Sequence, residues 1–217
     1  MRNYFTTWIL MYAVMISVFA VARLRAESAS ELHPPKIGDT IKDYKFRTIA
    51  GKELKLADAA NKGPVVLIVL RGFPGYQCPI CTKQVADLRK HAGDFKELGA
   101  SVVLVYPGAA DKLTDHAKQF LKDAKLPVPL VLVTDSDYKF IGLHNLRWNM
   151  AGETAYPSTF VLDTDHKVHF AKVSKSHGDR AKADEVLEVL RALRAAGSKG
   201  QEIPQDSGVP IEFQPRR

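Results

Sequence analysis

Cysteine is scarce in this chain: its 217 residues include two, Cys78 and Cys81, separated by two residues. With no third thiol, any disulfide within one copy of the chain must join these two. A structural bridge usually closes a long loop, because its stabilising effect grows with the size of the loop. A bridge across two intervening residues stabilises little. The scarcity of cysteine therefore excludes a disulfide-rich scaffold and favours a bridge that opens and closes.

Other functional signatures are also missing from the sequence. It contains no phosphate-binding loop and no arrangement typical of a serine triad. Basic residues outnumber acidic ones by 31 to 24 but form no long block, so we expect no nucleic-acid partner. The closest histidines, His166 and His169, would point to opposite faces of a strand, and structural zinc needs four ligands. We therefore predict no resident metal site and no cofactor, and Cu(I) bound by the two thiols enters only as an alternative function.

The first 26 residues have the features of an export signal. Residues 4–21 form an apolar stretch behind a basic start, and small residues allow cleavage after Ala22 or Ala26. An uncleaved membrane anchor is the alternative, because this stretch is just long enough to span a bilayer and Arg23 and Arg25 follow it. Both alternatives place the folded part in the periplasm or outside the cell. Membrane contact is expected only through this segment, if it is uncleaved.

The rest of the chain divides into three parts. Residues 27–36 read as a polar linker, residues 37–195 as one folded domain, and residues 196–217 as a disordered tail rich in glycine, proline and glutamine. Within the domain, apolar runs that are typical of strands alternate with segments of helical periodicity. We predict strands in residues 43–56 (a strand–turn–strand), 65–70, 101–106, 129–134, 158–162 and 167–173, and helices in residues 82–95, 113–124 and 186–193.

The cysteine pair lies between the predicted strand 65–70 and the helix that follows it. The unpaired N–H groups and the positive end of the dipole at a helix N-terminus favour a thiolate over a thiol. Cys78 and Cys81 are therefore the candidate redox site.

With this motif and this order of elements, residues 37–193 resemble the redoxin, or AhpC/TSA, group of the thioredoxin superfamily. The peroxiredoxin pattern Pro-x-x-x-Thr-x-x-Cys matches Pro74 and Cys81, with Cys78 at the threonine position. The resemblance implies an α/β, thioredoxin-like fold in which helices flank a central mixed sheet, with an N-terminal β-hairpin extension.

Pro157 departs from the peroxiredoxin pattern. Many peroxiredoxins carry an arginine at this position, whereas thioredoxins carry a proline, so the resemblance implies a cis peptide bond before Pro157. A second difference points the other way: no acidic residue occurs between Pro64 and Ile80, where many thioredoxins have a buried acid. The sequence thus combines features of both groups.

Three functions remain open. In the peroxidase hypothesis, ranked first, Cys81 attacks a hydroperoxide, Cys78 resolves the sulfenic acid to a disulfide, and an external thiol reductant restores the pair. In the second, Cys78 attacks a disulfide of a periplasmic protein and Cys81 resolves the mixed disulfide. In the third, the two thiols bind Cu(I) in a copper chaperone.

Arg71 and Tyr76 are the predicted supporting residues, together with Pro74 and Pro157. Arg71 would stabilise a thiolate or a peroxide if its loop folds back over the cysteines. Tyr76 would cover the site or donate a hydrogen bond. An ordinary strand-end arginine and a packed loop aromatic are the alternatives.

Overall fold

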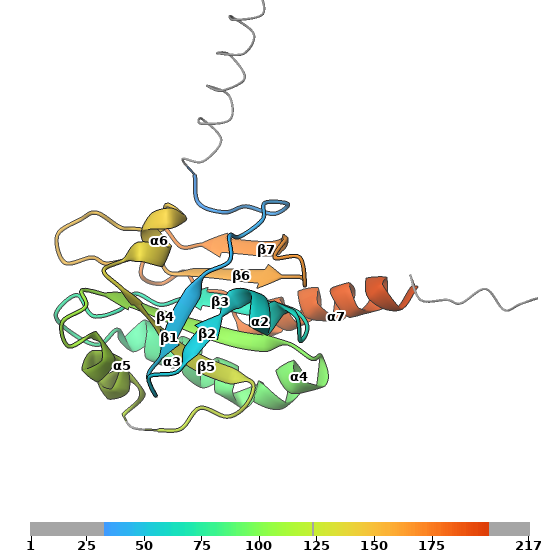
Figure 1. Cartoon of the computed structure of the whole chain (residues 1–217), viewed down its shortest axis with the longest axis horizontal. Coiled ribbons are helices and arrows are strands. Elements are labelled where there is room, and N and C mark those ends of the chain that lie inside the picture. The colour runs from blue at the N-terminus through green and yellow to red at the C-terminus, as the bar shows by residue number, and fades with distance from the viewer. Residues whose placement is uncertain (1–32, 123, 200–217) are drawn as a thin grey trace, which may run out of the picture.

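The computed structural model describes residues 33–122 and 124–199, which form a seven-stranded sheet with helices on both faces (Figure 1). The strands are β1 (Lys45–Thr48), β2 (Glu53–Lys55), β3 (Val65–Val69), β4 (Ser101–Gly108), β5 (Leu130–Ser136), β6 (Ser158–Leu162) and β7 (Val168–Val173). Their order across the sheet is β2-β1-β5-β4-β3-β6-β7. The predicted export signal at 1–26 lies outside the described residues, as do residues 200–217 of the predicted tail.

The sheet is mixed, as predicted. Strands β3, β4 and β5 are parallel, and the other neighbouring pairs are antiparallel. The predicted N-terminal hairpin is present as β1 and β2, and it continues the sheet because Arg47 of β1 pairs with Thr134 of β5. The predicted thioredoxin-like fold is confirmed.

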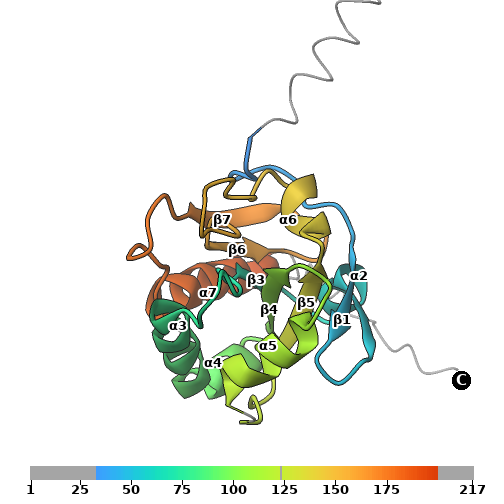
Figure 2. The same ribbon diagram turned by 90° about the vertical axis from the view of Figure 1, so that its left-hand side faces the viewer.

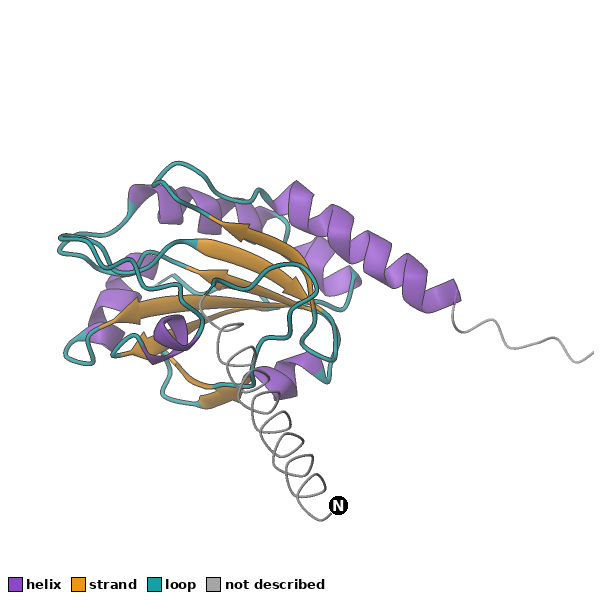
Figure 3. Ribbon diagram, turned by 90° about the horizontal axis from the view of Figure 1, so that it is seen from above, coloured by secondary structure: helices purple, strands orange, loops and turns teal. Residues whose placement is uncertain are grey.

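Helices pack in two layers. They are α2 (Leu56–Ala60), α3 (Pro79–Lys90), α4 (Ala92–Glu97), α5 (Leu113–Leu121), α6 (Lys139–Leu143) and α7 (Ala183–Lys199). Figure 2 shows α3, α4, α5 and α7 on one side of the sheet and α2 on the other, and Figure 3 shows the sheet between its helices from above. Of the described helices, none has the length and the hydrophobicity that crossing a membrane requires.

The position of strand β3 in the sheet explains why its residues are all apolar and do not alternate with polar ones. Val66 and Ile68 belong to the core under α3, α5 and α7, whereas Val65, Leu67 and Val69 belong to the core under α2 and α6. All five side chains are buried because both faces of the strand are covered. Strand β3 therefore holds the following loop, which carries the cysteines, at a rigid point of the molecule.

Two predicted helices end earlier than their periodicity suggested. The helix predicted over residues 82–95 is divided at His91, where the ring Nδ1 lies 2.9 Å from Asp94 Oδ2 and Gly93 follows as a poor helix former. The helix predicted over 113–124 ends at Leu121, because Lys122 adopts a left-handed conformation with φ of 51°. Apolar spacing marks the buried face of a helix but not its ends.

The prediction of a cis peptide bond before Pro157 is wrong. Within the described ranges, the cis bond lies at Val128–Pro129. Tyr156 and Pro157 continue the extended path of β6, with Tyr156 N–H donating to Leu146 O at 2.8 Å and Pro157 O accepting from Ser174 N–H at 2.9 Å. This pairing on both sides suits a trans bond, which keeps the strand straight.

Candidate active site

The two cysteines occupy the first turn of α3. Cys78 is the N-cap residue, Pro79 stands at the first helical position, and the Cys78 sulfur accepts the N–H of Cys81 at 3.3 Å. At this N-cap, a sulfur accepts the backbone hydrogen bond that a serine or aspartate oxygen usually accepts. Both thiols are free and buried, with Cys78 3% exposed and Cys81 1% exposed. The predicted position of the pair at a helix N-terminus is therefore observed.

The electrostatics of the two thiols differ. The pKa of Cys78 is well below its ordinary value, first because its sulfur holds a hydrogen bond with the Cys81 side chain. The N–H groups of Cys81 and Ile80 and the positive charge of Arg180 lower it further, against the effect of burial. The pKa of Cys81 is raised by the same hydrogen bond and by its burial. Of the two thiols, Cys78 is therefore the more readily ionised.

The loop before the cysteines is held tightly by its own sequence. Gly72 has φ of 77°, and a Cβ at this position would lie 2.1 Å from Pro107 O, so a side chain cannot be accommodated. Phe73 stacks on His116 with ring centroids 3.9 Å apart. Gln77, next to Cys78, donates to His116 O at 2.9 Å. These contacts fix the direction in which the chain enters α3.

Arg71 lies beside the thiols, but its guanidinium makes its hydrogen bonds to other residues. Nε and Nη2 donate to the two carboxylate oxygens of Glu153 at 2.8 and 3.1 Å, Nη2 also donates to Gly152 O, and Nη1 donates to Tyr76 OH at 2.5 Å. It is the backbone N–H of Arg71 that reaches Cys81 Sγ, at 3.5 Å. Arg71 thus supports the site through its main chain.

The other predicted supporting residues are Tyr76, Pro74 and Pro157, and they differ in how close to the surface they lie. Tyr76 is tied to Arg71 through its hydroxyl, and its side chain is 52% exposed, so its ring stands at the surface. Pro74 lies in the bend of the same loop. Pro157 is buried, one residue beyond the Ser158–Val69 pair, at the end of the sheet where β3 leads into the cysteine loop.

Sequence reasoning missed Arg180, whose positive charge lowers the pKa of both thiols. Its Nη1 donates to Ser176 O and Asp179 O, whereas Nε and Nη2 are buried and have no protein partner. About a hundred residues separate Arg180 from the cysteines. No local pattern could therefore have indicated it.

Sequence reasoning also missed three polar residues around the thiols. Glu153 accepts from Arg71 and from His177, whose Nε2 lies 2.8 Å from Oε1. Burial alone would raise the pKa of Glu153, but the hydrogen bonds from Arg71 and His177 lower it below its ordinary value. Tyr106 donates to Gln77 Oε1 at 2.8 Å, and burial raises the pKa of its hydroxyl, which also faces the negative charge of the thiols.

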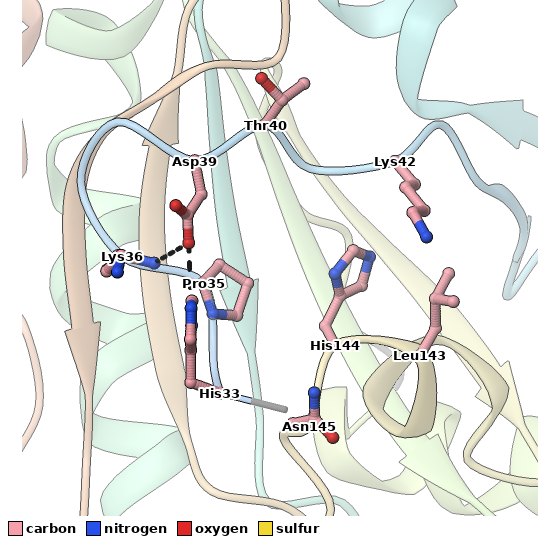
Figure 4. Close-up of a pocket in the computed structure, with 9 residues that line it drawn as sticks. All are labelled: His33, Pro35, Lys36, Asp39, Thr40, Lys42, Leu143, His144 and Asn145. Atoms are coloured by element: carbon pink, nitrogen blue, oxygen red, sulfur yellow. Dashed lines mark hydrogen bonds and ion pairs between the residues drawn. The ribbon is translucent and has the colours of Figure 1, made fainter. Parts of the chain in front are cut away.

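A pocket of about 360 Å³ lies apart from the cysteines, between the segment before β1 and the end of α6 (Figure 4). His144 lines it and is uncharged at neutral pH, because burial and the charge of Lys42 lower its pKa to about 4. Asp39 accepts from the Lys36 N–H and lies 3.8 Å from His33. Neither cysteine lines this pocket, so it is separate from the thiol site.

Comparison with known proteins places the chain in a family. The model of the AhpC/TSA family matches residues 37–171. Peroxiredoxin Bcp of Bacillus subtilis is 28% identical over 171 residues, which cover 76% of this chain and 98% of that protein. The crystal structure of peroxidoxin BcpB from Mycobacterium tuberculosis is 29% identical, with a TM-score of 0.59 over 73% of this chain and 98% of that one.

A more distant structure shows the fold alone. A yeast mitochondrial 1-Cys peroxiredoxin is 17% identical, with a TM-score of 0.63 over 83% of this chain and 84% of that one. Together with the matched family model, the cysteine pair and the fold lead to one conclusion. The chain belongs to the AhpC/TSA family, a group of peroxiredoxin-like thiol oxidoreductases within the thioredoxin superfamily.

Proposed function

We propose that this protein is an exported thiol peroxidase that reduces hydroperoxides by cycling Cys78 and Cys81 between the dithiol and the disulfide. The observation that carries the proposal is the pair itself: two free thiols in the first turn of α3, where the Cys78 sulfur accepts the Cys81 N–H at 3.3 Å and the pKa of Cys78 is lowered. A thiolate is the nucleophile that peroxide reduction needs, and a second thiol within the same helical turn can close the disulfide. Export rests on the sequence of residues 1–26.

The reaction balances without a cofactor. The thiolate attacks the terminal oxygen of R–O–O–H, the O–O bond breaks, the sulfur becomes a sulfenic acid, and the leaving alkoxide takes a proton to give R–OH. The second thiol then attacks the sulfenic acid, which forms the disulfide and releases water. An external dithiol reduces the bridge and is itself oxidised to a disulfide.

The order of attack is where motif and electrostatics differ. The position of Pro74 assigns the peroxide-reactive role to Cys81, as the sequence predicts. The electrostatics favour Cys78 as the attacking thiol, since its pKa is lowered while that of Cys81 is raised. Because only the thiolate reacts at an appreciable rate, we assign the first attack to Cys78 and the resolving step to Cys81.

Exchange with protein disulfides is the second candidate, and one observation favours it. A low pKa at the first cysteine of a Cys-x-x-Cys pair also suits attack on a disulfide. The burial of both cysteines favours a small substrate instead, because a folded protein must bring its disulfide to a residue that is 3% exposed. We therefore rank hydroperoxide reduction first.

We expect iodoacetamide to alkylate one thiol per chain in the reduced protein at neutral pH. The hydrogen bonds to Cys78 lower its pKa, whereas the hydrogen bond with Cys78 and burial raise the pKa of Cys81. As the pH is lowered, alkylation should decline with a midpoint well below the value of about 8.5 for free cysteine. Mass spectrometry of the alkylated peptide measures this profile; equal and slow labelling of both thiols at pH 7 would contradict it.

Replacing Arg180 with glutamine should slow the reaction with hydrogen peroxide by about 10-fold or more. The substitution removes a positive charge that lowers the pKa of Cys78 and two buried nitrogens, Nε and Nη2, that lack a protein partner. Stopped-flow measurement of the second-order rate constant tests this. Lys182→Gln is the control, because it removes an exposed charge from the same loop and should leave the rate unchanged.

A further inference from the structure

Glu153 joins two loops that surround the thiols. Its carboxylate takes two hydrogen bonds from Arg71, in the loop before α3, and one from His177, in the loop between β7 and α7. The side chain of Glu153 is 11% exposed and that of Arg71 is 4% exposed. Paired N–H donors on one carboxylate fix both direction and distance. The carboxylate therefore holds these two loops in one geometry.

Each of these loops carries a group that acts on a sulfur. The Arg71 backbone N–H donates to Cys81 Sγ at 3.5 Å, so the position of the Arg71 main chain sets this contact. Ala181, in the loop that follows His177, packs in the same core cluster as Cys78 and Cys81. Its neighbour Arg180 adds a positive charge that lowers the pKa of Cys78, beyond the effect of the hydrogen bonds to that sulfur. A shift of either loop would change the field at a sulfur.

The second loop is also fixed to α3 from the other side. Gln84 donates to Ala181 O at 3.4 Å, and the Ala183 N–H donates to Asp87 Oδ2 at 3.0 Å. These bonds hold residues 181–183 one to two turns beyond the cysteines. His177 and its contact with Glu153 fix the opposite end, so Arg180 lies in a segment that is anchored on both sides.

We propose that Glu153 is a positioning residue of the thiol site, which holds the Arg71 main chain against Cys81 and the His177 loop, with Arg180, beside Cys78. Glu153 acts through Arg71 and His177, the residues that its carboxylate contacts. For its effect on peroxide reduction the proposal rests on the proposed function. Its effect on the reactivity of the thiolate does not.

The test compares Glu153→Gln and Glu153→Asp with the wild type and with Asp163→Asn. Asp163 is the matched control: it lies 2.7 Å from His169 in a carboxylate–histidine pair of the same domain that none of the contacts above connects to the thiols. Three quantities are measured on each reduced protein. They are the pH profile of alkylation by iodoacetamide, the rate constant with hydrogen peroxide, and the midpoint of unfolding in urea.

We expect Glu153→Gln to raise the alkylation midpoint by about 0.5–1 pH unit and to slow peroxide reduction by about 10-fold. The alkylation midpoint and the peroxide rate of Glu153→Asp should lie between those of the wild type and Glu153→Gln. Aspartate keeps the charge, but its shorter side chain cannot accept all three hydrogen bonds. Asp163→Asn should lower the urea midpoint and leave the thiol profile unchanged. A folded Glu153→Gln protein with the profile and rate of Asp163→Asn overturns the proposal.

A second variant keeps the test decisive if Glu153→Gln does not fold. His177→Gln leaves the Arg71–Glu153 pair intact and releases only the loop that carries Arg180. It should shift the alkylation midpoint in the same direction by a smaller amount, and an unchanged midpoint overturns the proposal. If the wild type reacts with peroxide no faster than free thiol, the proposed function fails, while the alkylation profiles still decide the role of Glu153.

Discussion

Replacing Cys78 with serine is expected to slow the reaction with hydrogen peroxide by more than about 100-fold, to the rate of an ordinary thiol. In the wild type, the hydrogen bond with Cys78 and then burial raise the pKa of Cys81. The variant loses the first cause but keeps the second, because Cys81 is 1% exposed, so its thiol remains a poor nucleophile. Cys81→Ser should instead retain one rapid turnover, because the serine hydroxyl can still donate to the Cys78 thiolate. Single-turnover stopped-flow kinetics and trapping of the sulfenic acid measure both outcomes.

The pair of serine variants separates the hypotheses. If Cys78→Ser keeps the rapid turnover and Cys81→Ser loses it, the order of attack is the one that the Pro74 motif predicts. If the wild type and both variants react no faster than free cysteine, hydroperoxide reduction is not the function. A mixed disulfide with a protein substrate, trapped in Cys81→Ser, would then support dithiol–disulfide exchange.

Arg71→Met is expected to lower the free energy of unfolding by about 3–5 kcal/mol. Methionine fills much of the space but leaves the Glu153 carboxylate, which is 11% exposed, with only its bond to His177. It also removes the donors to Gly152 O and Tyr76 OH. Urea denaturation followed by circular dichroism measures the change.

Two companion variants show whether this loss comes from the buried pair. Lys45→Met removes a cation from the exposed Lys45–Glu53 pair and should change the stability by no more than about 0.5 kcal/mol. Arg71→Met combined with Glu153→Gln should recover part of the loss, because no unpaired carboxylate remains. An Arg71→Met protein as stable as Lys45→Met would show that the pair contributes nothing to stability.

Much of the architecture could be predicted because strands buried on both faces are apolar without interruption. The run at residues 65–70 became β3, and the run at 101–106 became the first part of β4. Helix ends were less predictable, since they depend on single residues such as His91 and Lys122. The short helix α6 was not predicted, because five residues carry too little periodicity.

The sequence by itself determined which atoms can do redox chemistry. With two thiols in the whole chain, three positions apart before a helix, the pair Cys78 and Cys81 was specified by elimination and by the physics of a helix N-terminus. The Pro74 spacing was equally local, and so was the AhpC/TSA resemblance, which the matched family model confirms.

Only the tertiary structure decided which arginine acts on the sulfurs. Arg71, seven residues before Cys78, was the natural candidate, yet its guanidinium is bound by Glu153, 82 residues away. The arginine whose charge lowers the pKa of both thiols is Arg180, in a loop that contacts Glu153 through His177 and α3 through Ala183. The physical reason is that a guanidinium binds the carboxylate that folding brings within reach, and distance along the chain does not determine that partner.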